Sequence, residues 1–415
     1  MSDPSTTDVV VFGATSFVGQ ILCHYLAERH GFTGDGPEGL TWAIAGRSRS
    51  KLDSLASDLG PGADALEVHV ADALDEEDMQ GLVSVARVVV STVGPYALYG
   101  SNLVAACAES GTDYVDLSGE THWIRQMLDR HQRTAESNGA RLVPCSGFDS
   151  IPSDLGVYVL QQAAQERFGQ PATRIRMGVK AMRGGLSGGT LASMLNSVEQ
   201  VRSDPSIRRE IGNPYALCPE GQRSGVRQPD VYRPEHDDVF DSWLAPFVMA
   251  AINTRVVHRT NALLDHAYGE SFRYDEAMMT GAGPGGAAKA AGLTAGLGAF
   301  LGAAVTPGLD KLLPKVLPDP GEGPSPEAQR KGFFDFRFWG TTGSGERLTA
   351  KVTGDRDPGY GSTAKMLGEA AACLALDVSD RGERPPGGFW TPASLLGSQL
   401  VERLEGHAGL TFEVH

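Results

Sequence analysis

Residues 9–19, with the sequence VVVFGATSFVG, constrain the fold of this chain more than any other stretch. Four consecutive apolar residues predict a strand buried on both faces, as in the middle of a parallel sheet. A tight turn follows, and apolar residues at helical spacing then predict a helix over residues 20–29. Such a turn has free backbone amides, and they point toward the same position as the positive end of the helix dipole. That position therefore favours the binding of an anion. The usual occupant is a dinucleotide pyrophosphate.

The spacing of this turn is Gly-x-x-Ser-x-x-Gly and so departs from the common Gly-x-Gly-x-x-Gly. Ser16 stands where glycine is common, so its side chain must either tolerate or bond the approaching phosphate. A plain strand-to-helix turn is the alternative interpretation. We expect the whole turn to contact the cofactor, through Gly13, Ala14, Thr15, Ser16, Phe17, Val18 and Gly19.

A second strand is predicted over residues 40–47, and its end should face the adenosine ribose. An acid at that place binds the free 2′-hydroxyl of NAD, whereas a cation binds the 2′-phosphate of NADP. The chain has no acid between Leu40 and Lys51, and it offers Arg47, Ser48, Arg49 and Lys51. Charge-assisted bonds from these residues predict NADP(H) as the cofactor. The alternative is that this basic run is only the solvated start of a helix.

Strands and helices continue to alternate as far as Cys145, which defines a Rossmann-type doubly wound parallel sheet and an α/β fold. Asp72 follows the third strand, where it could accept from the adenine amino group or cap the next helix. The fourth strand ends beside the first turn. Its last residues should therefore pass the ribose and nicotinamide, through Thr92, Val93, Gly94 and Pro95.

The pattern changes near residue 151, so we expect two domains. Residues 1–150 form the NADP-binding domain, and the helical residues 362–415 should pack back on it. Residues 151–361 form a substrate or dimerisation domain with a mixed or antiparallel sheet, including a hairpin over residues 333–353. A Gly/Ala-rich apolar segment at 281–307 is open to three interpretations: a membrane span, a surface-lying or lipid-facing helix, or a buried or mobile glycine-rich helical lid.

The amino-acid composition limits the kinds of molecule that this protein can bind. The net charge of −15 argues against nucleic acid, and the five scattered cysteines suit a reducing compartment without a disulfide framework or a metal site. The polar N-terminus shows no signal peptide, so we expect a cytoplasmic protein, with membrane association possible through residues 281–307. The sequence leaves open whether the protein forms a homodimer.

The catalytic scheme of short-chain dehydrogenases needs a Tyr-x-x-x-Lys pair, and no tyrosine here has lysine four residues later. Polar residues instead gather after the predicted strands, at Tyr96, Tyr99, Ser118, Glu120, Asp149, Ser150 and Asp154. Tyr96 or Tyr99 could donate to a substrate carbonyl or enolate, and Asp149 could orient the substrate. Each could equally stabilise its own loop.

The segments GATSFVG, AGRS, STVGPY, YVDLSGE, GFDSIPSDLG and GGFWTPAS occur in this order along the chain. Together they resemble the saccharopine dehydrogenase-like oxidoreductases, in the branch of the trans-acting enoyl reductases, nearly end to end. The resemblance implies an NADP-binding Rossmann domain and reduction of a carbon–carbon double bond in a lipid or polyketide acyl chain. Ser16 and Val18 depart from the residues that are common in the family.

Two further functions stay open from the sequence. One is an amino-acid or opine type of dehydrogenase. The other is a non-enzymatic nucleotide-binding protein attached to lipid surfaces through residues 281–307.

Overall fold

The computed structural model describes residues 6–415 apart from 35, 185–192, 194, 195, 197, 198, 201, 307–322 and 379–384. The chain divides into two compact units. The first unit joins Met1–Phe148 to Tyr360–Ala408, and the second joins Asp149–Gly359 to Gly409–His415. The sequence prediction that all of residues 362–415 pack on the first domain is therefore wrong for the last seven, which belong to the second unit.

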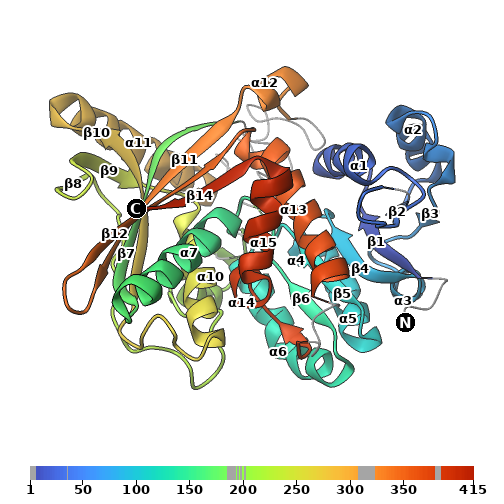
Figure 1. Cartoon of the computed structure of the whole chain (residues 1–415), viewed down its shortest axis with the longest axis horizontal. Helices are drawn as coiled ribbons and strands as arrows, with labels where there is room; N and C mark the ends of the chain where they lie inside the picture. The colour runs from blue at the N-terminus through green and yellow to red at the C-terminus, as the bar shows by residue number, and fades with distance from the viewer. Residues whose placement is uncertain are drawn as a thin grey trace. The chain divides into compact units, whose positions relative to one another are not determined.

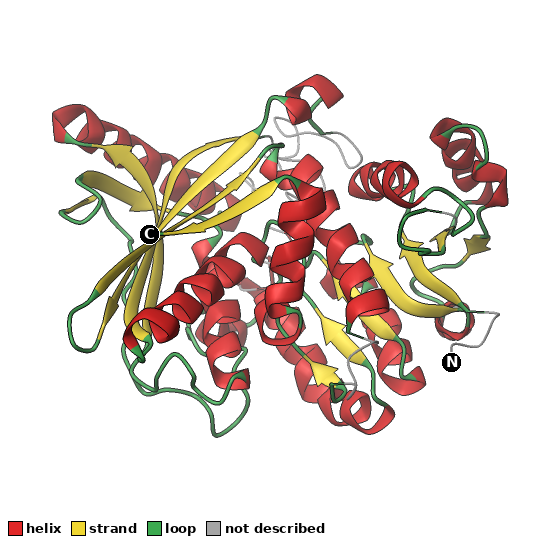
Figure 2. Ribbon diagram, in the orientation of Figure 1, coloured by secondary structure: helices red, strands yellow, loops and turns green. Residues whose placement is uncertain are grey.

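The first unit contains a parallel sheet with the strand order β13-β6-β5-β4-β1-β2-β3 (Figures 1 and 2). Its strands are β1 (Thr7–Phe12), β2 (Trp42–Gly46), β3 (Val68–Val70), β4 (Ala86–Ser91), β5 (Asp113–Asp116), β6 (Arg141–Val143) and β13 (Gly388–Phe389). The first six confirm the predicted alternation. The short β13 extends the edge beside β6 and was missed, because two residues in a Pro/Gly-rich stretch give no strand pattern.

The helices of this unit are α1 (Phe17–His30), α2 (Arg49–Leu59), α3 (Glu76–Ser84), α4 (Tyr96–Tyr99), α5 (Ser101–Ser110), α6 (Thr121–Asn138), α13 (Thr363–Ala372), α14 (Pro392–Leu395) and α15 (Gly397–Arg403). Short 3₁₀ or π turns are η1 (Ala63–Ala65), η3 (Pro358–Ser362), η4 (Cys373–Asp377) and η5 (Leu404–Ala408). The strand order reverses between β1 and β4. In doubly wound sheets of this kind, ligands bind at the carboxyl ends of the two strands between which the order reverses.

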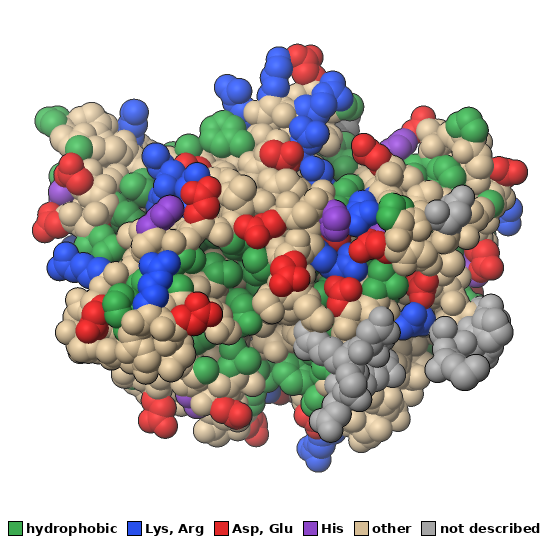
Figure 3. Space-filling model, viewed as in Figure 1, with side chains coloured by type: hydrophobic (Ala, Val, Ile, Leu, Met, Phe, Trp, Pro, Cys, Tyr) green, Lys and Arg blue, Asp and Glu red, His purple; other side chains and the backbone are tan. Residues whose placement is uncertain are grey.

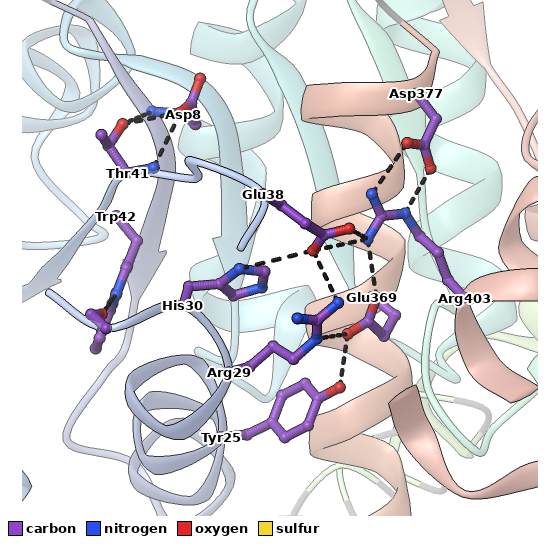
Figure 4. Close-up of polar contacts among 11 residues, drawn as sticks. Asp8, Tyr25, Arg29, His30, Glu38, Thr41, Trp42, Glu369, Asp377 and Arg403 are labelled. Carbon is purple, nitrogen blue, oxygen red and sulfur yellow. Dashed lines mark hydrogen bonds and ion pairs between the residues drawn. The ribbon is translucent and has the colours of Figure 1, made fainter. Parts of the chain in front are cut away.

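An ion cluster fastens the returning C-terminal helices to α1 (Figure 4). Glu369 of α13 is fully buried, accepts from the Tyr25 hydroxyl at 2.6 Å and pairs with Arg403 of α15 at 3.1 Å. Arg403 also pairs with Asp377 at 2.5 Å and with Glu38 at 3.1 Å. A buried carboxylate is tolerated only when it is paired in this way, so the cluster ties segments that are far apart in sequence.

The second unit contains a mixed sheet with the strand order β14-β12-β11-β7-β10-β9-β8. The strands are β7 (Ala172–Arg183), β8 (Glu235–Asp237), β9 (Ser242–Pro246), β10 (Arg273–Gly281), β11 (Phe333–Thr342), β12 (Arg347–Gly354) and β14 (Leu410–Val414). Only β7 and β10 pair in parallel. The predicted hairpin is β11–β12, and its alternate buried residues include Phe334, Phe336 and Phe338.

The helices of the second unit are α7 (Ile151–Phe168), α9 (Pro205–Ile211), α10 (Ala250–Leu263), α11 (Gly283–Val305) and α12 (Pro326–Arg330). α7 packs on β7, β11, β12 and β14, and α10 packs on β10 and α7. Gly156 permits the close approach of α7, because a Cβ there would lie 2.3 Å from the Phe338 ring. Helix α10 begins only at Ala250, because strand β9 extends as far as Pro246.

The surface in Figure 3 carries acidic and basic side chains interspersed with one another. Among the residues drawn in colour, this face offers no continuous basic track of the kind that binds a nucleic-acid backbone.

Candidate cofactor site and buried polar networks

The turn between β1 and α1 is held by its own side chains. Ser16 is the N-cap of α1, and its Oγ accepts from the Gly19 amide at 2.9 Å. The same oxygen lies 2.9 Å from Oγ1 of Thr92 at the end of β4. Thr92 in turn donates to the Gly13 carbonyl at 2.9 Å. The serine in the unusual position of the motif therefore joins the turn to the neighbouring strand.

Two glycines are required here for space. A Cβ on Gly19 would lie 2.2 Å from the Gly13 carbonyl oxygen, and a Cβ on Gly13 would lie 2.7 Å from Thr92 Oγ1. Gly13 also has φ +83°, a conformation that residues with a side chain rarely adopt. The turn is consequently tight and leaves its outer side to backbone amides.

Several amides of this turn are free to bind an anion. Ser16 donates to the Gly13 carbonyl, and Gly13 and Ala14 both donate to the Ala45 carbonyl. The amides of Thr15, Phe17 and Val18 have no hydrogen-bond partner among the residues that the structure describes. Free amides at the start of a 14-residue helix fit a pyrophosphate, so the residues present match a dinucleotide cofactor.

Basic side chains follow the end of strand β2. Arg47 and Lys51 are exposed and have no ion-pair partner in the described part of the chain, whereas Arg49 pairs with Asp53 at 2.8 Å. Ser48 is the N-cap residue of α2, but its side chain makes no capping bond. Two unpaired cations and an uncapped helix start suit the 2′-phosphate of NADP.

Asp72 has a local role in the structure. Its Oδ1 accepts from the Leu74 amide at 3.0 Å, and its own amide donates to Asp78 at 2.8 Å. Asp72 therefore shapes the turn between β3 and α3. Because its carboxylate is exposed, a contact with adenine stays a prediction.

The loop after β4 is positioned by an acid that the sequence did not assign to this role. Glu120 is buried, and its two carboxylate oxygens accept from the amides of Tyr96 at 2.8 Å and Ala97 at 2.9 Å. The Tyr96 side chain is also buried, and its hydroxyl donates to the Ser91 carbonyl at 2.9 Å. These bonds hold the segment Val93–Pro95 at the end of β4, where the fold predicts the ribose and nicotinamide.

A second acid at this edge was missed. Asp116 ends β5, is fully buried and accepts from the Ser118 amide, the Ser118 hydroxyl, the Tyr114 hydroxyl and the Cys145 amide. Burial raises the pKa of Asp116 to about 6, although these hydrogen bonds oppose the rise. The motif YVDLSGE was the available signal, because Asp116 lies near the end of a predicted strand and Glu120 follows that strand.

The three predicted catalytic residues lie in different settings. Tyr96 holds its own loop, as described above. Tyr99 is partly exposed, and its hydroxyl makes no hydrogen bond to the described residues. Asp149 is partly exposed and begins the second unit. The geometry gives Tyr96 a positioning role, and the catalytic roles of all three stay predictions. No group of His, Cys, Asp and Glu in the described residues could hold a metal.

The second unit encloses a polar network that sequence reasoning missed. Glu276 of β10 accepts from the Tyr274 hydroxyl at 2.7 Å and from the Asn253 amide nitrogen at 2.9 Å. Asn253 also bonds Ser153 at 3.0 Å and Ser150 at 3.1 Å, both near the start of α7. Burial raises the pKa of Glu276 to about 7. Acids in a strand are usually exposed, so no sequence pattern indicates that Glu276 is buried.

Comparison with known proteins agrees with this geometry. The family model of the saccharopine dehydrogenase NADP-binding domain matches residues 9–143, which include the turn, the β2 end and the β4 loop. Two solved structures share the fold over nearly the whole chain. Saccharopine dehydrogenase (L-Glu forming) of Saccharomyces cerevisiae has a TM-score of 0.51 at 13% identity and covers 99% of this chain and 100% of its own. Homospermidine synthase of Legionella pneumophila has a TM-score of 0.52 at 10% identity, with coverages of 100% and 93%.

Closer relatives occur in mycobacteria. The trans-acting enoyl reductase of Mycobacterium bovis is 36% identical over 409 residues, which cover 96% of each chain. Rv2449c of Mycobacterium tuberculosis, provisionally named a trans-acting enoyl reductase, is 39% identical over 419 residues and covers 99% of this chain and 98% of its own. The chain therefore belongs to the saccharopine dehydrogenase-like family, in the branch of the trans-acting enoyl reductases, and is an oxidoreductase that uses NADP(H).

Proposed function

We propose that this protein uses NADPH to reduce a carbon–carbon double bond conjugated to a carbonyl in an acyl chain of the lipid or polyketide type. The observation that carries the proposal is end-to-end similarity, at 36–39% identity, to relatives named for enoyl reduction. The free amides of the first turn and the unpaired cations after β2 support the cofactor half of the reaction.

NADPH supplies a hydride, which adds to the β-carbon, and a proton must then reach the α-carbon. Amides of Thr15, Phe17 and Val18 would hold the pyrophosphate, and Arg47 and Lys51 would hold the 2′-phosphate. The segment Val93–Pro95, fixed through Glu120, restricts where the nicotinamide can lie. Orientation of the cofactor is the principal contribution that these residues make.

For the proton we propose Tyr99. Its hydroxyl is partly exposed and unbonded within the described residues, whereas the Tyr96 hydroxyl is buried and already donates to a carbonyl. Proton transfer from Tyr99 to the enolate, followed by its reprotonation from solvent, balances the reaction. The Tyr99→Phe variant should lower kcat by about a hundredfold and leave NADPH affinity unchanged.

The experiment is oxidation of NADPH in the presence of a panel of trans-2-enoyl thioesters of increasing chain length. We expect turnover with enoyl thioesters and none with their saturated counterparts. Turnover only with an amino acid plus a keto acid would identify an opine-type dehydrogenase instead. Binding of NADPH without turnover on either panel would favour a non-enzymatic nucleotide-binding protein.

We further propose that the protein acts in the cytoplasm on an acyl substrate that is free or bound to a carrier. The support is the acyl chemistry in the names of its relatives. Thioesters of coenzyme A and of an acyl carrier protein, compared at equal concentration, distinguish the two forms of substrate.

A further inference from the structure

Helix α11 uses a narrow side to contact the rest of its unit. It packs against β8, β9 and β10 (Figure 1). Its buried residues are Gly286, Ala290 and Ala304. A Cβ on Gly286 would lie 1.9 Å from the Gly281 carbonyl oxygen, so this end of the helix lies directly on the end of β10. Most of the remaining helical surface faces outward.

The outward surface is apolar. Leu293, Leu297 and Leu301 recur at intervals of four residues, which places them in one row that we call the leucine ridge. Leu293 is 48% exposed and Leu301 is 41% exposed. Lys289 is the only charged residue between Gly283 and Val305, in a chain whose net charge is −15. A helix that is apolar on all sides needs a covering for its outer side.

The outward surface of α11 is better suited to contact with the hydrocarbon of a lipid layer than to contact with another protein. Interfaces between proteins carry about one hydrogen bond per 100–200 Å². The hydroxyl of Thr294 already donates to the Ala290 carbonyl, and the remaining outward residues from Ala291 to Gly302 have no polar side-chain atoms. Such a surface cannot specify a protein partner by hydrogen bonds, whereas a lipid layer requires none.

The dimensions of α11 agree with this. At 1.5 Å per residue its 23 residues extend for about 34 Å. It is the one helix within the described residues that has the length and composition to cross a membrane. Because α11 is packed along the sheet, it would lie parallel to the membrane surface. An ordinary interfacial helix has a polar face on the side away from the lipid, and in α11 the sheet covers that side instead.

We propose that the leucine ridge of α11 docks this protein on the surface of a lipid bilayer, with the ridge in the acyl layer. The attraction is hydrophobic, since the acidic chain is repelled by anionic headgroups. Binding to neutral vesicles should therefore be at least as strong as binding to anionic vesicles. This inference does not depend on the reaction proposed above.

The test is co-flotation of the full chain with vesicles of phosphatidylcholine, alone or mixed with phosphatidylglycerol. The wild-type protein should float with both, and Leu293→Glu/Leu301→Glu should not. Phe168→Glu/Tyr232→Glu is the matched control, because it adds the same two charges at exposed positions in the same unit and should float. The circular dichroism spectrum and Tm should be equal in all three proteins, which shows that the variants are folded.

Absence of flotation for the wild-type protein, or equal flotation of the ridge variant, would overturn the proposal. Sedimentation of the same proteins identifies the other possible occupant. A wild-type dimer that the ridge substitutions convert to monomers, without any flotation, would show that the ridge is an interface between two copies.

Discussion

Ser16 Oγ lies 2.9 Å from Thr92 Oγ1, so the first turn of the sheet is bonded to the end of the neighbouring strand β4. One residue of this pair caps α1, and the other begins the loop that we place at the nicotinamide. Two hydroxyl groups therefore join the first turn, where we place the pyrophosphate, to the loop where we place the nicotinamide.

The tightness of this turn leads to the first prediction. Gly19→Ala should weaken NADPH binding by at least tenfold, because its Cβ would lie 2.2 Å from a backbone oxygen and must displace the turn. Overpacking of this kind costs about 1–3 kcal/mol. Fluorescence titration with NADPH measures the change. Gly81→Ala is the matched control, since a Cβ there meets nothing within 4 Å, and its affinity should be unchanged.

Cofactor preference depends on the unpaired cations after β2. Arg47→Glu should reduce the preference for NADPH over NADH by about tenfold or more, through loss of a charge-assisted bond and repulsion of the 2′-phosphate. The ratio of the two dissociation constants is the measurement. Arg49→Glu applies the same charge reversal two residues away, at a side chain already paired with Asp53, and should change the ratio far less. Equal effects of the two substitutions would refute a specific role for Arg47.

The buried ion cluster should stabilise the first unit. Arg403→Met removes the closer of the two cations beside the buried Glu369 and leaves only Arg29, at 3.9 Å, so it should lower the free energy of unfolding by about 3 kcal/mol. Thermal or urea unfolding measures this. Lys331→Met breaks an exposed pair with Glu327 and should cost less than about 1 kcal/mol. A similar loss in both variants would mean that burial of the cluster is unimportant.

Glu276 makes stability depend on pH. Its pKa is about 7 in the folded protein and 4.5 in the unfolded chain, so the folded state holds more protons between these values. Stability should therefore fall as pH rises through this window, by on the order of 1–3 kcal/mol. Glu276→Gln removes the titration, so the loss between about pH 5 and about pH 8 should be smaller in the variant. Parallel pH profiles of Tm in the two proteins would contradict this.

The fold of the first unit could be predicted because the sequence patterns that indicate it are local. Buried apolar runs, the glycines of the first turn and the absence of an acid near Arg47 all lie within short stretches of sequence. In the second unit, β10 was missed because its acids Asp275 and Glu276 suggest exposure. Asp275 is in fact buried by pairing with Arg176, almost a hundred residues earlier in the chain. A partner so distant leaves no periodic pattern near the strand.

The same limit explains the C-terminal error, the missed Asp116 and the unassigned role of Glu120. β14 pairs with β12, and only this tertiary pairing assigns it to the second unit. Glu120 acts on amides 23 and 24 residues earlier, where sequence shows only a polar residue after a strand. Motifs thus located the cofactor turn, whereas the side chains that position it became apparent from the fold.

Transfer of deuterium from the cofactor tests whether hydride passes from NADPH to an enoyl chain. The protein is incubated with NADPH carrying two deuterium atoms at C4 of the nicotinamide and with a trans-2-enoyl thioester, and the product is analysed by mass spectrometry and NMR. The product should be a saturated thioester with one deuterium on the β-carbon and none on the α-carbon. An unreduced thioester, or a product without deuterium at the β-carbon, would contradict it.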